Sequence, residues 1–169
     1  VFGIPSYGAT ETGSSIFIPY IDEEALLSEV YAKNEPVAEK PYWVNRVEDY
    51  LRVAVQKWYA PRLNNVDYPY GAYLSASING QKIKVSEMLP LFRYVREFYI
   101  KALGKTLDDD SLIKDEGVAE GEQLYEESID LRGVLNTTSS GKFVYARLSR
   151  KQLQMEPPLN NKSPYQQIT

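Results

Sequence analysis

Residues 72–104, AYLSASINGQKIKVSEMLPLFRYVREFYIKALG, decide the fold that we expect for this chain. Apolar and polar residues alternate on both sides of the pair Asn79-Gly80. This pattern is typical of a β-hairpin, because a two-residue turn between strands requires positive φ at both central positions, which Asn and Gly tolerate. The first part of the segment therefore predicts a hairpin over residues 72–85.

The remainder of this segment predicts an amphipathic helix over residues 87–103. Ser86 can act as its N-cap, and Gly104 suits the C′ position after its last turn. Apolar residues recur at helical spacing and form a wide stripe, which we expect to face the core: Met88, Leu91, Phe92, Val95, Phe98, Tyr99 and Ala102. On the opposite side, Arg93 and Glu97 have the i, i+4 spacing of an exposed ion pair.

Two more helices are expected before the hairpin. In residues 44–60, one face would carry Val47, Leu51, Ala54 and Trp58. A shorter helix begins after Asp22, whose side chain can cap it, and continues to about Lys33. In this shorter helix, Leu26, Leu27 and Val30 are expected to point inward.

The chain after the long helix changes in character. Residues 105–130 contain ten acidic and two basic side chains, and they predict two short helices at about 108–115 and 119–127. The stretches ESIDLRGVLN (127–136) and GKFVYARLS (141–149) then have the pattern of two strands. We expect them to form a second hairpin.

Together these elements predict an α+β fold, with a small helical core and one or two β-hairpins, flanked by extended N- and C-terminal arms. We expect an extended N-terminal arm at 1–20 and a single α+β domain at 21–150, which includes the acidic segment 105–130. A basic, Pro-rich C-terminal tail follows at 151–169. From Met155 onward, the Pro and Gln content predicts no packed element.

The composition argues against several classes of function. A net charge of −4 over 169 residues disfavours nucleic acid as a partner, since binding to phosphate backbones needs clustered Lys and Arg. No apolar run approaches the ~20 residues that span a bilayer, so we expect no membrane span. The chain has no Cys and no His, which removes disulfides, thiolate chemistry, imidazole catalysis and most transition-metal sites.

No motif in the sequence predicts a metal or catalytic site. The run DDDSLIKDEG at 108–117 lacks the acidic and Gly positions of a calcium-binding EF-hand loop. Neither a phosphate-binding loop nor a G-x-S-x-G nucleophile elbow occurs in the chain. We therefore expect no cofactor, no metal site and no catalytic residue.

Tyrosine is abundant, with 14 residues, and it suggests where partners bind. Tyr either fills the border of a core or forms interfaces, because it combines a large apolar ring with a hydroxyl group. The stretch Tyr68-Pro69-Tyr70-Gly71-Ala72-Tyr73 predicts an aromatic loop with one of these two roles. The candidate partner-binding residues are Phe17, Tyr20, Tyr42, Trp43, Tyr68, Tyr70, Tyr73 and Tyr165.

The organisation of the chain suggests a non-catalytic structural or linker subunit that binds other protein subunits in a larger assembly. Linkers of light-harvesting antennae are one class with such arms and aromatic contacts, an analogy of organisation without a shared motif. One alternative is a small-ligand or peptide-binding module with a pocket near the Tyr-rich loop 68–73. Another is an enzyme that uses carboxylates and Tyr, which the absence of His disfavours.

The sequence does not identify the cellular compartment of the protein. The absence of Cys favours an intracellular or organellar compartment over secretion. Because the sequence begins with Val1 and no secretory signal follows, removal of a targeting peptide is one interpretation.

Overall fold

A computed structural model describes residues 8, 10, 20–32, 41–71, 73–114, 117–118, 122–129, 141–155 and 162–168. Within these ranges the fold is α+β with a small core, as expected. The helices are α1 (Glu23–Ala32), α2 (Val47–Tyr59), α3 (Pro90–Ala102) and α4 (Pro164–Gln167), with a 3₁₀ turn at Val85–Glu87. The strands are β1 (Ser77–Ile78), β2 (Gln81–Lys82), β3 (Ile113–Lys114), β4 (Gly117–Val118), β5 (Glu122–Ile129) and β6 (Gly141–Ala146).

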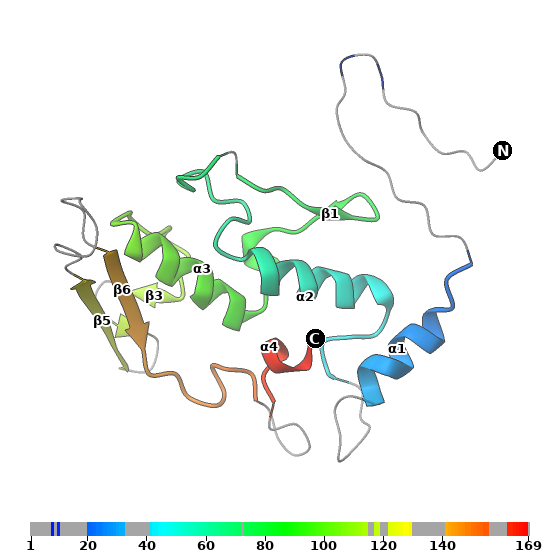
Figure 1. The fold of residues 1–169 in the computed structure, drawn as a ribbon. Helices are drawn as coiled ribbons and strands as arrows, with labels where there is room; N and C mark the ends of the chain where they lie inside the picture. Colours follow the sequence, from blue (N-terminus) through cyan, green and yellow to red (C-terminus); the bar gives the residue numbers. More distant parts are fainter. Residues whose placement is uncertain are drawn as a thin grey trace.

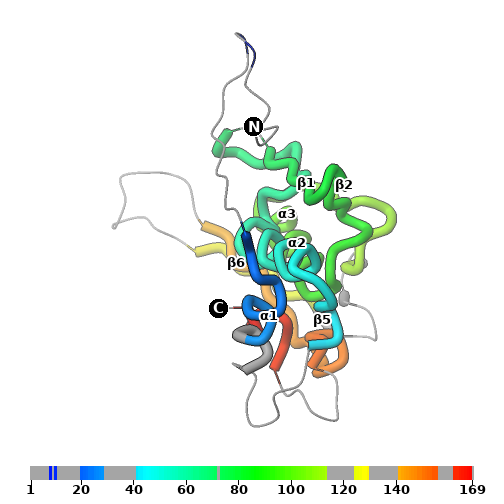
Figure 2. The backbone as a smooth tube through the Cα atoms, turned by 90° about the vertical axis from the view of Figure 1, so that its right-hand side faces the viewer, coloured from blue at the N-terminus to red at the C-terminus, as the bar shows by residue number. Residues whose placement is uncertain are grey.

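Helix α3 lies in the middle of the molecule. Figure 1 shows α2 and the β1–β2 hairpin on one side of α3, and the sheet that contains β3, β5 and β6 on the other. Figure 2, turned by 90°, shows that the β1–β2 hairpin and α1 lie on different sides of α2. The strands form a two-stranded sheet β1-β2 and a four-stranded antiparallel sheet in the order β3-β4-β5-β6.

The core has two parts because α3 buries two faces. The first cluster joins α2, the β1–β2 hairpin and α3, and its buried members are Trp43, Val44, Val53, Ala60, Leu63, Ile83, Met88, Phe92 and Ile168. The second cluster, under the four-stranded sheet, is built on Tyr94 and Ile113, with Leu124 and Ala146 packed against them. Phe92 and Tyr94 are two residues apart in α3, so they point to nearly opposite sides of it.

The first hairpin is confirmed, with strands shorter than its predicted range. Asn79 and Gly80 have φ of 49° and 73°, the positive values that the turn requires. The register pairs Ser77 with Lys82 and Ile78 with Gln81. One further backbone bond, from the N–H of Ile83 to the carbonyl of Ala76 (2.9 Å), holds the open end of the hairpin.

The end of α3 is confirmed, but its predicted start is wrong. Gly104 has φ of 70°, and its N–H donates to the carbonyl of Lys101 at 2.8 Å. Pro90 is the first residue of the helix, and Leu89 before it is extended (φ −60°, ψ 139°). Because a residue that precedes proline is disfavoured in the helical region, Ser86 cannot begin this helix and lies in the 3₁₀ turn instead.

The first two helices form where expected, with partly different buried faces. Asp22 caps α1 as predicted, accepting a hydrogen bond from the N–H of Ala25 at 3.0 Å. Leu27 packs against the first cluster, but Leu26 is exposed, contrary to the prediction. The side chain of Val30 lies outside the described residues.

The predicted apolar face of α2 is also wrong in part. Leu51 and Trp58 are exposed, Trp58 at 64 %, whereas Val53 and Gln56 are buried. Gln56 can face the core because its side-chain oxygen accepts a hydrogen bond from the N–H of Leu89 at 2.8 Å. The prediction from apolar spacing treats Gln56 as a surface residue. The predicted buried face of α2 is therefore displaced around the helix axis from the observed one, which contains Val53 and Gln56.

The acidic segment does not form the two helices predicted at about 108–115 and 119–127. It contains β3, β4 and β5 instead, and β5 pairs with β6 from Leu124↔Ala146 to Ile129↔Gly141. The second hairpin is thus confirmed in part: β5 begins before the predicted first strand and overlaps it at residues 127–129, and residues 130–136 of that predicted strand lie outside the described residues. Cross-strand pairing and packing against α3 decide this conformation, and neither can be read from the acidic composition.

The prediction that no packed element follows Met155 is wrong for residues 162–168. Ser163, Pro164, Gln167 and Ile168 are buried, and Ile168 belongs to the first cluster. Figure 1 shows α4 between α2 and the chain that leaves β6. Of the predicted N-terminal arm, only residues 8, 10 and 20 lie within the described ranges, so the arm and the domain boundaries stay predictions.

No helix in the described ranges is long and apolar enough to span a bilayer.

Candidate functional site

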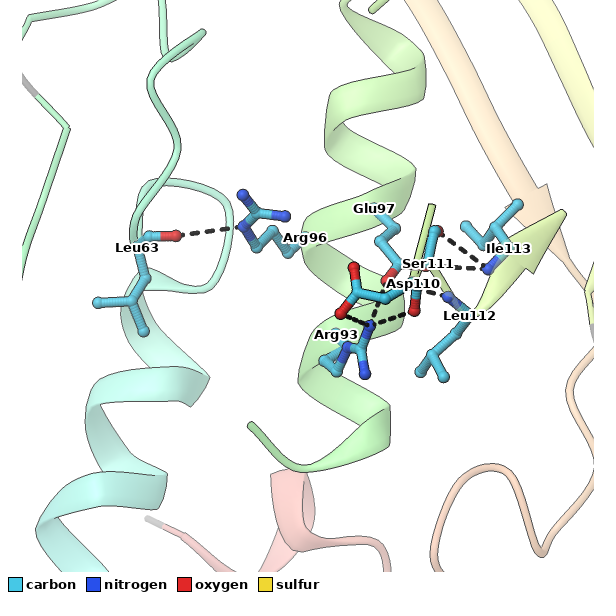
Figure 3. Close-up of polar contacts among 8 residues, drawn as sticks. All are labelled: Leu63, Arg93, Arg96, Glu97, Asp110, Ser111, Leu112 and Ile113. Carbon is cyan, nitrogen blue, oxygen red and sulfur yellow. Dashed lines mark hydrogen bonds and ion pairs between the residues drawn. The ribbon is translucent and has the colours of Figure 1, made fainter. Parts of the chain in front are cut away.

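Two adjacent charged residues of α3, Arg96 and Glu97, form hydrogen bonds with segments on opposite sides of the helix. Figure 3 shows Arg96 pointing to Leu63 on one side of α3, and Glu97 pointing to Ser111 on the other. Arg96 is buried, and its guanidinium donates hydrogen bonds to the carbonyls of Leu63 (3.2 Å) and Asn64 (3.1 Å). It therefore fixes the loop that follows α2.

Glu97 holds the turn that leads into β3. Its side chain is almost fully buried, with 2 % of the residue exposed. The carboxylate accepts hydrogen bonds from the hydroxyl of Ser111 (2.7 Å) and from the N–H groups of Leu112 (3.2 Å) and Ile113 (3.0 Å). The N–H of Ile113 also donates to the Ser111 hydroxyl oxygen at 3.2 Å, so the carboxylate and this hydroxyl together link α3 to the start of the sheet.

The predicted Arg93–Glu97 pair exists at 3.6 Å, but it does not lie on the outer surface as expected. Arg93 also donates to the carbonyl of Asp110 at 2.7 Å. Burial lowers the pKa of Arg96, and the charges of Asp108 and Glu97 oppose this shift. Arg93, Arg96 and Glu97 thus all bond to other groups of the protein, which suits a role in positioning the segments around α3.

The loop that Arg96 fixes presents a set of tyrosines, which we call the loop surface: Tyr68, Tyr70 and Tyr73. Tyr68 is half-buried, with its ring 6.0 Å from that of Tyr99 and 5.4 Å from the guanidinium carbon of Arg62. Tyr70 is 78 % exposed and meets Tyr68 edge-on at 5.9 Å. Burial raises the pKa of Tyr99, with smaller contributions from the hydroxyls of Tyr68 and Tyr70.

The base of this loop is held by backbone bonds. The N–H of Asn64 donates to the carbonyl of Leu74 at 2.8 Å, and the N–H of Leu74 donates to the carbonyl of Arg62 at 3.2 Å. Asn65 is buried, and its side chain bonds the carbonyl of Pro61 (2.8 Å) and the N–H of Asp67 (3.1 Å). The exposed tyrosines are therefore carried on a loop whose two ends are tied together.

A second aromatic set lies on the four-stranded sheet, and sequence reasoning missed it. We call it the hairpin surface: Tyr125, Phe143 and Tyr145. Tyr125 and Tyr145 stack across the strands at 5.1 Å, and Phe143, at 55 % exposure, lies 5.6 Å from Tyr145. The hydroxyl of Tyr145 donates to Glu127 at 2.7 Å, which raises the pKa of Tyr145. The alternation Phe143-x-Tyr145 was the available signal, since such spacing places side chains on one face of a strand.

Two hollows on the surface lie away from the loop surface. One, of about 530 Å³, lies beside the C-terminal end of α3, and Lys101, Lys105, Asp108 and Glu126 are among its lining residues. The other, of about 580 Å³, is lined by Tyr125, Tyr145, Ala146 and Arg147. No tyrosine of the loop surface lines either hollow, so a ligand pocket near residues 68–73 stays a prediction.

Among the other predicted site residues, Tyr42 and Trp43 are adjacent in the chain, and Trp43 contacts the C-terminal segment that carries Tyr165. Trp43 is only 8 % exposed, stacks with Tyr50 at 6.2 Å and donates to the side chain of Gln167, so it anchors the core. Tyr20 and Tyr42 are exposed. Tyr165 is exposed beside Lys57, whose ammonium lies 4.6 Å from the ring centroid. Phe17 lies outside the described residues.

No group of three or more acidic side chains in the described part of the chain is arranged to hold a metal ion. Comparisons with protein-family models, with curated proteins and with solved structures found no match to this chain.

Proposed function

We propose that this protein is a non-catalytic structural subunit that binds other protein subunits, and that the loop surface is a contact site. The observation that carries the proposal is the exposure of Tyr70 and Tyr73 on a loop whose base is fixed. Tyr is enriched at protein interfaces, where its ring supplies apolar contact and its hydroxyl a hydrogen bond.

The fixed base of the loop supports a binding role in a second way. Ordering a mobile loop on binding lowers affinity, whereas a preorganised loop avoids that entropic cost. Arg96 contributes to this order from inside the molecule, through its bonds to the carbonyls of Leu63 and Asn64. Tyr68 supports Tyr70 edge-on and is itself packed on Tyr99. The ring of Tyr70 therefore has packing support before any partner binds.

A paired substitution tests this proposal. We expect Tyr70→Ala combined with Tyr73→Ala to weaken partner binding by roughly 30-fold, the effect of losing ~2 kcal/mol of interface energy. The tagged full-length chain and its variants would be crosslinked in lysate of the source cells. The captured proteins would be quantified by mass spectrometry, and the affinity of each captured partner would then be measured with the purified pair.

The matched control is Leu51→Ala, which removes an exposed apolar side chain from the outer face of α2. It should leave capture and affinity unchanged. Far-UV circular dichroism and the melting temperature should be the same for both variants and the wild type, because neither Tyr70 nor Tyr73 is buried. Equal affinity of the double variant and the wild type for every captured partner would overturn the proposal.

A further inference from the structure

We infer that the hairpin surface is a self-association site, and that its occupant is the same surface of a second copy of this chain. The inference rests on the hairpin surface and its charges, and it is independent of the loop surface. Tyr125, Phe143 and Tyr145 form an exposed aromatic patch on the face of the sheet that points away from α3. Contiguous exposed apolar patches mark interaction sites on folded proteins.

The register of β5 and β6 defines what this face carries. Tyr125 lies opposite Tyr145, and Glu127 lies opposite Phe143. The other face carries Leu124 and Ala146, which pack in the second core cluster. Because side chains alternate between the two faces of a strand, residues 125, 127 and 129 share the outer face with residues 143 and 145.

Opposite charges stand at the two ends of the aromatic patch. Glu127 is exposed at one end and bonds the hydroxyl of Tyr145. Arg147 is exposed at the other end, where it lines a hollow of about 580 Å³ together with Tyr125 and Tyr145. Its guanidinium forms no ion pair with any residue in the described part of the chain. The patch is therefore acidic at one end, basic at the other and aromatic between.

Such a patch is complementary to itself. A two-fold axis that crosses the strands at the level of Tyr125 and Tyr145 places two copies face to face with antiparallel strands. After this rotation, Arg147 of one copy has the same position along the strand direction as Glu127 of the second copy. The two residues are offset sideways by one strand spacing, about 4.8 Å, because Arg147 follows β6 and Glu127 lies in β5. An Arg side chain spans that offset, and the pair forms twice because a two-fold interface repeats each contact.

The aromatic rings meet at the centre of the same arrangement. Tyr145 faces Tyr145 of the second copy, and Arg147 lies above Phe143 of the second copy, which suits a cation–π contact. The rings of Tyr125 and Tyr145 stack with their planes only 13° apart, so each ring covers one face of the other. This orientation suits interdigitation with other side chains more than stacking of flat ligands such as sugars or bases on the ring faces.

Charge reversal tests the inference on the full-length chain. We expect sedimentation velocity over a wide concentration range to show a monomer–dimer equilibrium for the wild type. Glu127→Arg or Arg147→Glu alone places two like-charged pairs in the interface, and each should raise the dimer Kd on the order of tenfold or more. The double variant Glu127→Arg/Arg147→Glu should restore the wild-type Kd. The double variant, like Glu127→Arg alone, lacks the hydrogen bond between Glu127 and the Tyr145 hydroxyl. Recovery of the dimer Kd in the double variant would therefore be due to the charge pairs between the two copies.

A matched control lies on the same strand. Lys142→Glu reverses a charge on the opposite face, where Lys142 pairs with Glu126 at 3.8 Å, and it should leave the dimer Kd unchanged. Melting temperatures of all variants check that each one is folded. The Tyr70→Ala/Tyr73→Ala variant should dimerise as the wild type does, which separates this inference from the proposed function.

Three outcomes would overturn the inference. A wild-type chain that stays monomeric at every concentration would leave the patch to a different protein. A dimer that neither single reversal weakens would place the contact elsewhere on the molecule. Weakening by both single variants without recovery in the double variant would exclude the Glu127–Arg147 pairing.

Discussion

At the scale of single residues, the buried charges of Arg96 and Glu97 in α3 are held by hydrogen bonds to segments that are distant in the sequence. Glu97 alone accepts three hydrogen bonds from the turn before β3, and two of them come from backbone N–H groups. A buried donor that loses its acceptor costs about 1–3 kcal/mol, since water cannot replace the lost bond. The neighbouring Arg96 has the same role toward the loop after α2.

We expect Glu97→Ala to lower the free energy of unfolding by about 3 kcal/mol. It leaves the Ser111 hydroxyl and the N–H of Leu112 without an acceptor, and it leaves the N–H of Ile113 only its 3.2 Å bond to the Ser111 hydroxyl oxygen. Urea denaturation measures the change. Glu87→Ala is the matched control, since its ion pair with Lys84 at 3.3 Å is exposed. The control should change stability by no more than about 0.5 kcal/mol. Equal losses in the two variants would contradict the anchoring role of Glu97.

At the scale of elements, adjacent residues predict where α3 ends better than they predict which of its faces are buried. Gly104 completes a C-terminal cap: the N–H of Lys105 donates to the carbonyl of Ile100 at 3.1 Å, and the N–H of Gly104 donates to that of Lys101 at 2.8 Å. This cap needs a left-handed residue, which Gly adopts without steric cost. The faces of α3 depend on neighbours that are distant in the sequence.

We expect Gly104→Ala to destabilise the protein by about 1–2 kcal/mol, the cost of a left-handed conformation for a residue with a Cβ atom. The added Cβ would meet only the ammonium of Lys142 at 3.8 Å, so crowding adds little. Gly141→Ala serves as the control, because Gly141 has no positive φ and its added Cβ would lie 3.9 Å from Ile129. Thermal unfolding compares the two, and a larger loss at Gly141 would refute this account.

At the scale of the whole molecule, residues 162–168 complete the first core cluster from the far end of the sequence. Ile168 is 2 % exposed among Trp43, Val44 and Val53. The indole of Trp43 donates to the side chain of Gln167, and the ammonium of Lys57 donates to the carbonyl of Ile168. The segment is therefore part of the core of the folded chain.

We expect Ile168→Ala to cost about 2–5 kcal/mol, the range for truncating a buried aliphatic side chain and leaving a cavity. Tyr165→Ala in the same segment should cost about 1 kcal/mol or less, since Tyr165 is exposed and loses mainly a cation–π contact. Chemical denaturation followed by tryptophan fluorescence measures both. If Ile168→Ala is as mild as Tyr165→Ala, the segment does not contribute to the core.

The features that depend on a few adjacent residues follow from the amino-acid sequence alone. The turn at Asn79-Gly80, the cap at Asp22 and the C′ position of Gly104 were all predictable. Each rests on a local φ preference or on a hydrogen bond between residues at most a helical turn apart. The strand pattern of residues 127–129 and 141–146 also predicted part of the second hairpin.

Contacts between distant parts of the chain determine which polar residues are buried, where the acidic segment forms strands and which aromatic residues stay exposed. Gln56, Arg96 and Glu97 have the pattern of surface positions, and they are buried because their partners lie 14 to 33 residues away in the chain. Ile168 reaches the core beside Trp43, although the residues around it are polar. The physical reason is the same in each case: a group is buried when distant parts of the chain supply its contacts, and local spacing carries no information about them.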